Sequence, residues 1–149
     1  MEKQKGRVLV IDDDILVLKL LKQRLEKAGF EVATRNEALG TLKAINDFAP
    51  SIVIVDLKMP AVNGDALSEL VRKNTNIPVI LHSSEPLIVL QEKARTSGAI
   101  GAITKTSDDA LFLAQFDRLF TRSKTSMRKS ADLNSSKHII FNEDKKEKL

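Results

Sequence analysis

Residues 51–64 constrain the fold of this chain more than any other stretch. They begin with four consecutive apolar, mostly β-branched residues, 52–55, which is typical of a strand buried on both faces. The run ends on a carboxylate, Asp56, and a turn rich in Pro, Asn and Gly follows it. Open α/β sheets bind ligands at the carboxyl ends of their parallel strands. Asp56 therefore predicts a ligand site, although an aspartate at such a position can also simply open a loop.

Strand-like apolar runs and helix-like segments alternate five times along the chain. We expect strands at residues 7–12, 31–35, 52–56, 78–82 and 99–105. We expect helices at about 14–28, 37–47 and 65–73, a fourth that opens with Ser84 as its N-cap and ends at Gly98, and a last one at about 108–120. This alternation predicts an α/β fold with a doubly wound parallel sheet, right-handed crossovers and helices on both faces.

Composition narrows the class of protein. The chain has 149 residues, 42% of them hydrophobic and 30% charged, which suits one soluble globular domain. It has no Cys, which excludes disulfides, thiolate nucleophiles and zinc–thiolate sites. There is no apolar signal-peptide segment, and no run approaches the ~20 apolar residues of a membrane span. We therefore expect a cytoplasmic protein.

The net charge of +4 belongs to the C-terminal segment. Residues 1–121 hold 16 Lys and Arg against 16 Asp and Glu, whereas residues 122–149 hold 8 against 4. We expect a domain at 1–121 and a basic, disordered tail at 122–149, in which only residues 139–141 form an apolar island. The tail lacks a stacking pattern of aromatic residues, so nucleic-acid binding is not expected.

Carboxylates follow two strands that should be neighbours in the sheet. Asp12 and Asp13 come directly after the first strand, and Asp56 ends the third, so the fold should bring all three into one pocket. Their mutual repulsion would be relieved by a hard divalent cation, and oxygen ligands without His or Cys point to Mg²⁺, with Mn²⁺ as the alternative. For Asp14 we favour the simpler role of capping the first helix.

Two further polar residues should reach the same edge of the sheet. The fourth strand leads to Ser83 and the fifth to Lys105. A hydroxyl and an ammonium beside an acidic metal site are suited to bind phosphoryl oxygens. Taken singly, Ser83 is more often a helix-start serine and Lys105 a solvated lysine, but their coincidence with three acids at strand ends favours a functional site.

These features resemble a response-regulator receiver domain of bacterial two-component systems, a single-domain receiver similar to CheY. The resemblance covers about residues 6–121. It rests on Asp12-Asp13, on Asp56 with Met59-Pro60 and Gly64, on Pro78 five residues before Ser83, and on Lys105. It implies a flavodoxin-like, five-stranded parallel sheet in the order 2-1-3-4-5 with five helices.

The resemblance also implies a role for each polar residue. Asp56 would accept a phosphoryl group from a phosphohistidine and become an acyl phosphate. Lys105 would add a positive contact, and Ser83 would hydrogen-bond the attached phosphoryl group and shift the conformation. The implied ligands of Mg²⁺ are Asp12, Asp13, Asp56 and the backbone carbonyl of Lys58.

The partners implied are a histidine kinase or histidine phosphotransfer protein, and a downstream protein target. A homodimer through the fourth helix, fifth strand and fifth helix would also suit the family. Such a protein is not an enzyme in the usual sense, although it assists its own phosphorylation and dephosphorylation. We expect either a single-domain receiver that acts as a phosphorelay shuttle or binds a target, or a fragment of a longer regulator.

The sequence departs from the family at two places. Receivers usually have a cis proline after the lysine, where this chain has Thr106, and an aromatic switch residue three positions before it, where this chain has Ala102. A cis bond before Thr would cost ~3 kcal/mol, so this loop should be strained or differently shaped. Phosphoryl chemistry should survive both changes, whereas the aromatic part of the family's switch lacks its usual residue here.

Other functions account for the residues less well. A Ser–His hydrolase at His82-Ser83 is excluded because adjacent strand residues point to opposite faces. A Mg²⁺-dependent phosphohydrolase could use a nucleophilic Asp, but it would want a second acid at positions 57–58, where Leu and Lys stand. A receiver-like module that binds partners without phosphorylation would not need all five polar positions, which are intact here.

Two expectations concern the surface around the site. At helical spacing, Val17, Leu21 and Leu25 should face the core, which would leave Ile15 and Leu18 toward solvent. These two residues would either pack under a neighbouring loop or, as the resemblance implies, form part of a kinase-docking surface. Lys58 and Glu85 each follow a site residue by two positions. Their side chains either pair across the mouth of the site or simply point into solvent.

Overall fold

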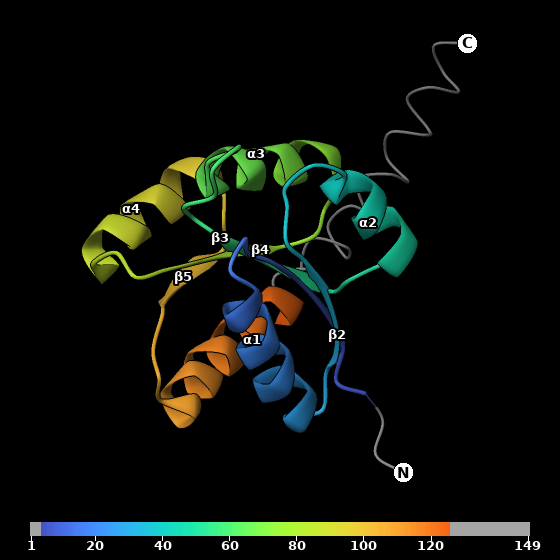
Figure 1. Ribbon diagram of the computed structural model, residues 1–149, viewed down its shortest axis with the longest axis vertical. Coiled ribbons are helices and arrows are strands. Elements are labelled where there is room, and N and C mark those ends of the chain that lie inside the picture. Colours follow the sequence, from blue (N-terminus) through green and yellow to red (C-terminus); the bar gives the residue numbers. More distant parts are fainter. Residues whose placement is uncertain (1–3, 126–149) are drawn as a thin grey trace, which may run out of the picture.

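A parallel sheet of five strands forms the centre of the protein (Figure 1). The structure is a computed structural model and describes residues 4–125. The strands are β1 (Arg7–Ile11), β2 (Glu31–Arg35), β3 (Ile52–Asp56), β4 (Val79–Ser83) and β5 (Gly101–Thr104), in the order β2-β1-β3-β4-β5. Every neighbouring pair is parallel, which confirms the predicted fold class and strand order.

Helices cover both faces of the sheet. They are α1 (Ile15–Lys27), α2 (Thr41–Phe48), α3 (Gly64–Asn74), α4 (Leu87–Ser97) and a fifth, described over residues 109–125. In Figure 1, α1 and the 109–125 helix lie below the sheet, while α2, α3 and α4 lie above it. The sheet is therefore the middle layer of three.

The central strand β3 explains why its sequence reads as one apolar run. Ile52 and Ile54 pack into the core on the side of α1 and the 109–125 helix, and Val53 and Val55 into the core on the opposite side. None of the four exposes more than 1% of its surface. Burial of a side chain of this size contributes about 1.5–3 kcal/mol, so β3 anchors both layers of helices.

The helix α1 begins as predicted, with Asp14 as its N-cap accepting a hydrogen bond from the Leu16 backbone N–H at 2.9 Å. The prediction for its buried face was partly wrong. Leu18 is 6% exposed and belongs to the core, whereas Leu16 is 76% exposed and Ile15 55%. Packing against β1 and the 109–125 helix turns the apolar stripe toward Leu18, Leu21 and Leu25, and Val17 lies at its margin.

The prediction that the second helix starts at residue 37 was wrong, because residues 36–40 form bends and a turn and α2 begins at Thr41. The Arg35 side chain donates to the Leu39 carbonyl oxygen at 2.5 Å and helps to close this turn. Gly40 then takes a φ of 83°, which disfavours residues with a Cβ and interrupts any helix arriving from residue 37. The helical pattern of the sequence thus extends further than the helix itself.

The fourth helix also starts later than predicted. Ser84 is not its N-cap: α4 begins at Leu87 after an extended Pro86, which has no side-chain cap. A residue that precedes proline is disfavoured in the helical region, and this keeps Glu85 out of the helix. The strand β4 ends one residue later than predicted, at Ser83, and β5 is shorter than predicted at both ends.

The last helix runs further than predicted. It continues through residue 125, beyond its expected end at 120 and across the expected boundary between domain and tail at 121–122. The rest of the tail, residues 126–149 with the apolar island at 139–141, lies outside the described residues. Within residues 4–125, no helix is long and apolar enough to cross a membrane.

Candidate functional site

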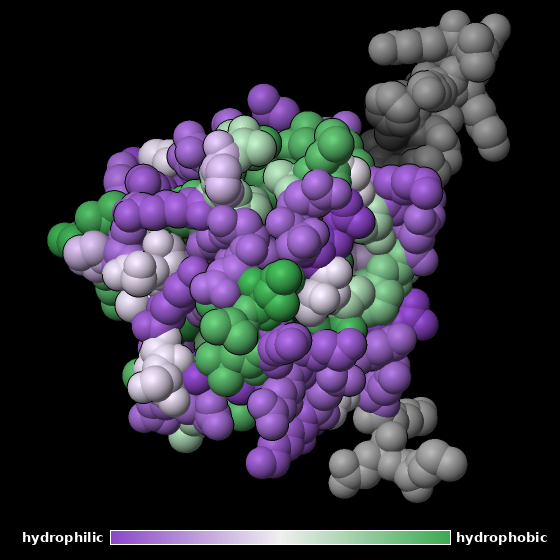
Figure 2. Space-filling view, viewed as in Figure 1, coloured by the Kyte–Doolittle hydropathy of each residue, from purple (hydrophilic) through white to green (hydrophobic). Residues whose placement is uncertain are grey.

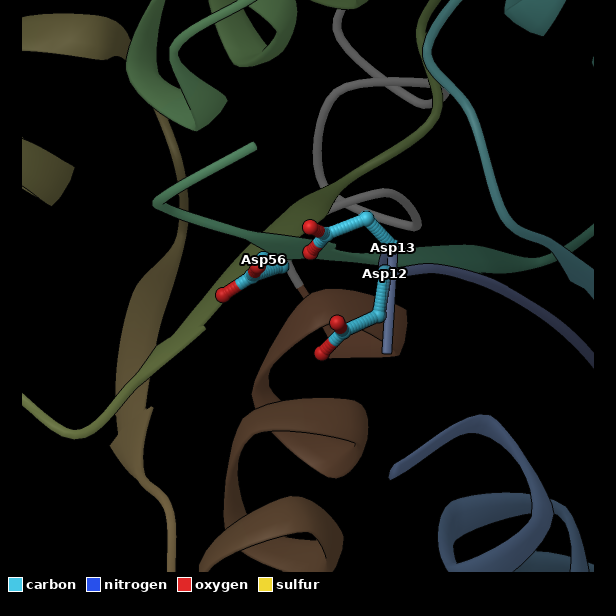
Figure 3. Close-up of side chains that lie close together, drawn as sticks. All are labelled: Asp12, Asp13 and Asp56. Atoms are coloured by element: carbon cyan, nitrogen blue, oxygen red, sulfur yellow. The ribbon is translucent and has the colours of Figure 1, made fainter. Parts of the chain in front are cut away.

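The carboxyl ends of β1 and β3 bring three carboxylates together. Ile11 pairs with Val55 in the sheet, so Asp12 and Asp56 come next to each other at the ends of adjacent strands. One carboxylate oxygen each of Asp12, Asp13 and Asp56 lies within 4.8 Å of the others. Figure 3 shows the Asp12 and Asp13 side chains reaching from the end of β1 to the side where Asp56 lies. The sequence predicted this group.

Lys105 joins the acids from the end of β5. Its Nζ lies 3.3 Å from Asp12 Oδ2 and 3.3 Å from Asp56 Oδ1. Its backbone N–H donates to the Ser83 carbonyl oxygen at 2.8 Å, which ties the residue to β4. One ammonium thus lies between two carboxylates that are nearly inaccessible to solvent, with exposures of 1% and 4%.

Burial and repulsion between carboxylates raise the pKa values of Asp12 and Asp56. The pKa of Asp56 rises to about 6, mainly because the side chain is desolvated and also because Asp12 is close. Desolvation likewise raises the pKa of Asp12. Burial alone would lower the pKa of Lys105, but Asp12 and Asp56 raise it above its usual range. The site therefore has an excess of negative charge that a single lysine does not offset.

The contacts of Asp12 show what the site would accept. Its Oδ1 accepts a hydrogen bond from the Asp14 backbone N–H at 2.9 Å. Its Oδ2 is buried and receives no hydrogen bond from the described residues, although Lys105 is near enough for an ion pair. A buried carboxylate oxygen without a donor, beside two further carboxylates, fits a hard divalent cation.

The loop after β3 packs closely against Asp56. The Gly64 backbone N–H donates to the Leu57 carbonyl oxygen at 2.9 Å. The backbones of Lys58 and Asn63 pair in a single antiparallel β-bridge. A Cβ on Gly64 would lie 2.3 Å from the Asp56 carbonyl oxygen, so only glycine fits there. This fold of the loop keeps the Lys58 backbone beside the carboxylate of Asp56, where it lowers the pKa of that carboxyl group and so partly offsets the effect of burial.

The end of β4 carries Ser83 and His82 on opposite faces. Asp56 pairs with His82 in the sheet, which places Ser83 at the same edge as the three acids, as predicted. The Ser83 side chain is buried, and its Oγ accepts a hydrogen bond from the Glu85 backbone N–H at 3.2 Å. His82 lies within the core against Phe112, with its Nε2 unpaired among the described residues. Desolvation, Lys105 and Arg24 together lower the pKa of His82 to about 3.

The predicted pair across the mouth of the site is present, and it has a third member. Lys58 Nζ lies 3.3 Å from Glu85 Oε1, and Lys93 Nζ lies 3.5 Å from Glu85 Oε2. The sequence analysis missed Lys93, which stands on α4 eight residues after Glu85. A lysine on a helix that follows the loop gives no signal of its own, because its direction depends on how the helix packs.

A buried arginine also escaped the sequence analysis. Arg24 on α1 is 4% exposed and contacts the segment that follows Lys105. A signal for it existed: position 24 follows Leu21 by three residues and so lies on the core-facing stripe of α1.

The two departures in sequence have structural counterparts. All peptide bonds within residues 4–125 are trans, including the bond between Lys105 and Thr106, so the loop takes a different shape from the cis form. Beside Ala102 there is a cavity of about 300 Å³ between α4, β5 and the 109–125 helix.

Comparison with known families agrees with this geometry. Residues 8–117 match the model of the response regulator receiver domain. The chain belongs to this family. As a receiver, it is a signalling module of two-component systems. The Vibrio cholerae chemotaxis response regulator CheY4 superposes with a TM-score of 0.71 at 22% identity, over 79% of this chain and 99% of that one, which supports the shared fold.

Longer regulators also match this receiver. It is 30% identical to the transcriptional regulatory protein CpxR homolog of Haemophilus influenzae over 79% of this chain and 52% of that protein. It is 28% identical to the DNA-binding response regulator MtrA of Mycobacterium tuberculosis over 70% of this chain and 46% of that protein. This chain also superposes on NtrX from Brucella abortus with a TM-score of 0.75 at 29% identity. The superposition covers 86% of this chain and 29% of NtrX. The chain thus spans about half, or less, of the length of the curated relatives it matches.

Proposed function

We propose that this receiver accepts a phosphoryl group on Asp56 from a phosphohistidine, and that the modified domain then binds a protein target. The observation that carries the proposal is the position of Asp56: a buried carboxylate at the end of the central strand, 3.3 Å from Lys105 Nζ and grouped with two further acids. This arrangement combines a nucleophile, a cation and a metal-binding group at one edge of the sheet.

In the proposed transfer, a carboxylate oxygen of Asp56 attacks phosphorus. A P–O bond forms while the P–N bond to the donor imidazole breaks, and the electron pair of that bond stays on the imidazole nitrogen. Lys105 is near enough to contact the charge that develops on the phosphoryl oxygens. Because burial holds the pKa of Asp56 at about 6, positive charge in the site also favours the ionised form that attacks.

The donor set fits Mg²⁺, with Asp12, Asp13 and Asp56 as the side chains that would hold it and the Lys58 carbonyl as a fourth ligand. The buried Oδ2 of Asp12, which receives no hydrogen bond from the described residues, supports this fit. When bound, Mg²⁺ supplies positive charge that offsets the acids and the phosphoryl oxygens. Asp13 is exposed, which suits a ligand that contacts the cation directly or through water.

The exposed start of α1 supports a protein donor. Figure 2 shows an apolar patch over this part of the molecule, where Ile15 and Leu16 lie directly after the acidic loop. A histidine kinase or a histidine phosphotransfer protein that docks here would present its phosphohistidine to Asp56. For the output, we propose the face made by α4, β5 and the 109–125 helix, which bears the cavity beside Ala102.

Incubation of the protein with Mg²⁺ and acetyl phosphate, followed by intact-mass spectrometry, tests the proposal. We expect a gain of one phosphoryl group that is sensitive to alkali, absent in Asp56→Asn and retained in Asp14→Asn. Full labelling of Asp56→Asn would refute Asp56 as the acceptor. Catalytic release of phosphate from a range of phosphomonoesters would instead indicate a phosphohydrolase, and partner binding without any labelling would indicate a phosphorylation-independent module.

A further inference from the structure

Arg24 reaches from α1 to the segment after β5 and makes three contacts there. Its Nε donates to Asp109 Oδ1 at 2.6 Å, and its Nη2 donates to the Thr106 carbonyl oxygen at 2.7 Å. Its guanidinium carbon lies 5.2 Å from the centre of the Phe112 ring. The side chain itself is 3% exposed. A charged residue on α1 thus donates both to the loop that follows Lys105 and to the start of the 109–125 helix.

Stability does not explain this arrangement. Removing a guanidinium group from water costs free energy. Replacing a buried ion pair by well-packed apolar residues often leaves the stability of a protein unchanged or increases it. The partner Asp109 is 70% exposed, so solvent screens its attraction for the arginine. The contact with the Thr106 carbonyl group, in contrast, fixes one particular conformation of the backbone.

The backbone around Lys105 is held on both sides. On the N-terminal side, the backbone N–H of Lys105 donates to the Ser83 carbonyl oxygen at 2.8 Å. On the C-terminal side, Arg24 holds the Thr106 carbonyl group, and the Thr106 side chain accepts a hydrogen bond from the Asp108 backbone N–H at 3.1 Å. A threonine has no ring to fix its φ, so the conformation of this loop depends on such contacts.

We propose that Arg24 is a positioning residue that fixes the backbone at Thr106 and thereby keeps Lys105 Nζ within reach of both Asp12 and Asp56. The inference rests on the proposed role of Lys105 in phosphoryl transfer. Because catalytic contacts are sensitive to displacements of about 1 Å, a loop released at Thr106 leaves the lysine poorly placed even when the fold is intact.

The test compares Arg24→Met with Lys22→Met, which removes an exposed charge from the same helix. Each change is made in the wild-type protein and in Lys105→Ala, and the rate of Mg²⁺-dependent labelling by acetyl phosphate is measured. We expect Arg24→Met to slow labelling about tenfold in the wild-type background and by less than about twofold in Lys105→Ala. Lys22→Met should leave both rates unchanged.

The two backgrounds separate positioning from a merely structural role. An equal loss in both, or no loss in the wild-type background, would refute the proposal. If Arg24→Met does not fold, Arg24→Lys decides, because it keeps the charge but lacks the planar fork that reaches both Asp109 and Thr106. A loss that disappears in Lys105→Ala supports the proposal, and no loss overturns it, with Lys22→Arg on the same helix as the control. If Lys105→Ala is labelled at the wild-type rate, the proposed role of Arg24 is refuted, while Asp56 remains the acceptor. If the wild-type protein is not labelled at all, the proposed function itself is refuted.

Discussion

Lys58 Nζ lies 3.3 Å from Glu85 Oε1, and this pair joins the loop after Asp56 to the loop after Ser83. The two side chains differ in environment, because that of Lys58 is 69% exposed and that of Glu85 only 14%. Lys93 Nζ lies 3.5 Å from the other oxygen of Glu85, so this carboxylate has a partner on each side. Lys58 and Glu85 thus lie across the mouth of the site, and we call this pair the cover.

We predict that this cover slows hydrolysis of the acyl phosphate on Asp56. An exposed ion pair contributes at most about 1 kcal/mol, which corresponds to about fivefold in rate. Lys58→Ala and Glu85→Ala should each shorten the half-life of the phosphorylated protein in excess Mg²⁺, and the double variant should add little more. Lys43→Ala, which removes the exposed pair with Asp47 on α2, is the control. Additive effects, or none, would rule out the cover.

The acidic site should destabilise the protein when Mg²⁺ is chelated. The pKa of Asp56 is about 6 in the folded protein, above its unfolded value near 4, so the folded state retains a proton that the unfolded state loses. Stability from this group is therefore fully present below about pH 4 and is lost as the pH rises through 6, by at most about 3 kcal/mol.

Asp56→Asn removes this penalty. In EDTA it should raise the melting temperature relative to wild type at pH 7.5, and the difference should shrink toward pH 4, as measured by thermal unfolding across that range. Added Mg²⁺ should narrow the gap at pH 7.5, because it stabilises the wild-type protein more. A wild-type protein that is the more stable of the two at pH 7.5 in EDTA would contradict the prediction.

His82 should make the fold sensitive to acid. Its pKa is lowered to about 3, so below the unfolded value of 6.5 the unfolded state takes up a proton that the folded state does not. The contribution of neutral His82 to the free energy of unfolding is therefore fully present above pH 6.5. It is lost at up to about 1.4 kcal/mol per pH unit as the pH falls toward 3.

Urea unfolding at pH 7 and pH 5 measures this effect. The free energy of unfolding of the wild-type protein should fall more between these pH values than that of His82→Leu. Comparing the change within each protein removes any difference in packing that the leucine introduces. Equal changes in the two proteins would show that His82 is protonated readily in the folded state.

Leu16 should contribute to docking of the phosphodonor protein. It is 76% exposed beside the acidic loop, whereas Leu18, which the sequence pattern indicated for this role, is buried. Leu16→Glu should slow transfer from a phosphorylated histidine kinase or phosphotransfer protein at least about tenfold, if the leucine is a central contact. Labelling by acetyl phosphate should be unchanged.

Leu70→Glu serves as the control, since Leu70 is a 43% exposed leucine on α3, across the sheet from α1. It should leave both rates as in wild type. A loss of labelling by acetyl phosphate in Leu16→Glu would instead mean that the residue supports the site structurally. Leu18→Glu, in contrast, should prevent folding, because it would place a charge in the core.

The sequence by itself determined the sheet and the grouping of the acids. The apolar runs that end at Asp12 and Asp56 predict buried strands, and in a parallel sheet such ends meet at one edge. The parallel direction of the strands follows from their alternation with helices, whereas the strand order 2-1-3-4-5 was implied by the resemblance to receivers. Ser83 and Lys105 reach the same edge for the same reason.

Tertiary structure decided which way the long side chains point. Leu18 is three positions from both Ile15 and Leu21, so helical spacing alone is compatible with more than one buried face of α1. The packing of the helix on β1 decides which face is buried. Spacing places Arg24 on the core-facing stripe of α1, but its partner Asp109 lies 85 residues further along the chain and could not be predicted from local sequence. Lys93 likewise meets Glu85 only because α4 packs beside the site loops. Local sequence fixes backbone conformation within a few residues, whereas contacts of this kind are set by the packing of whole elements.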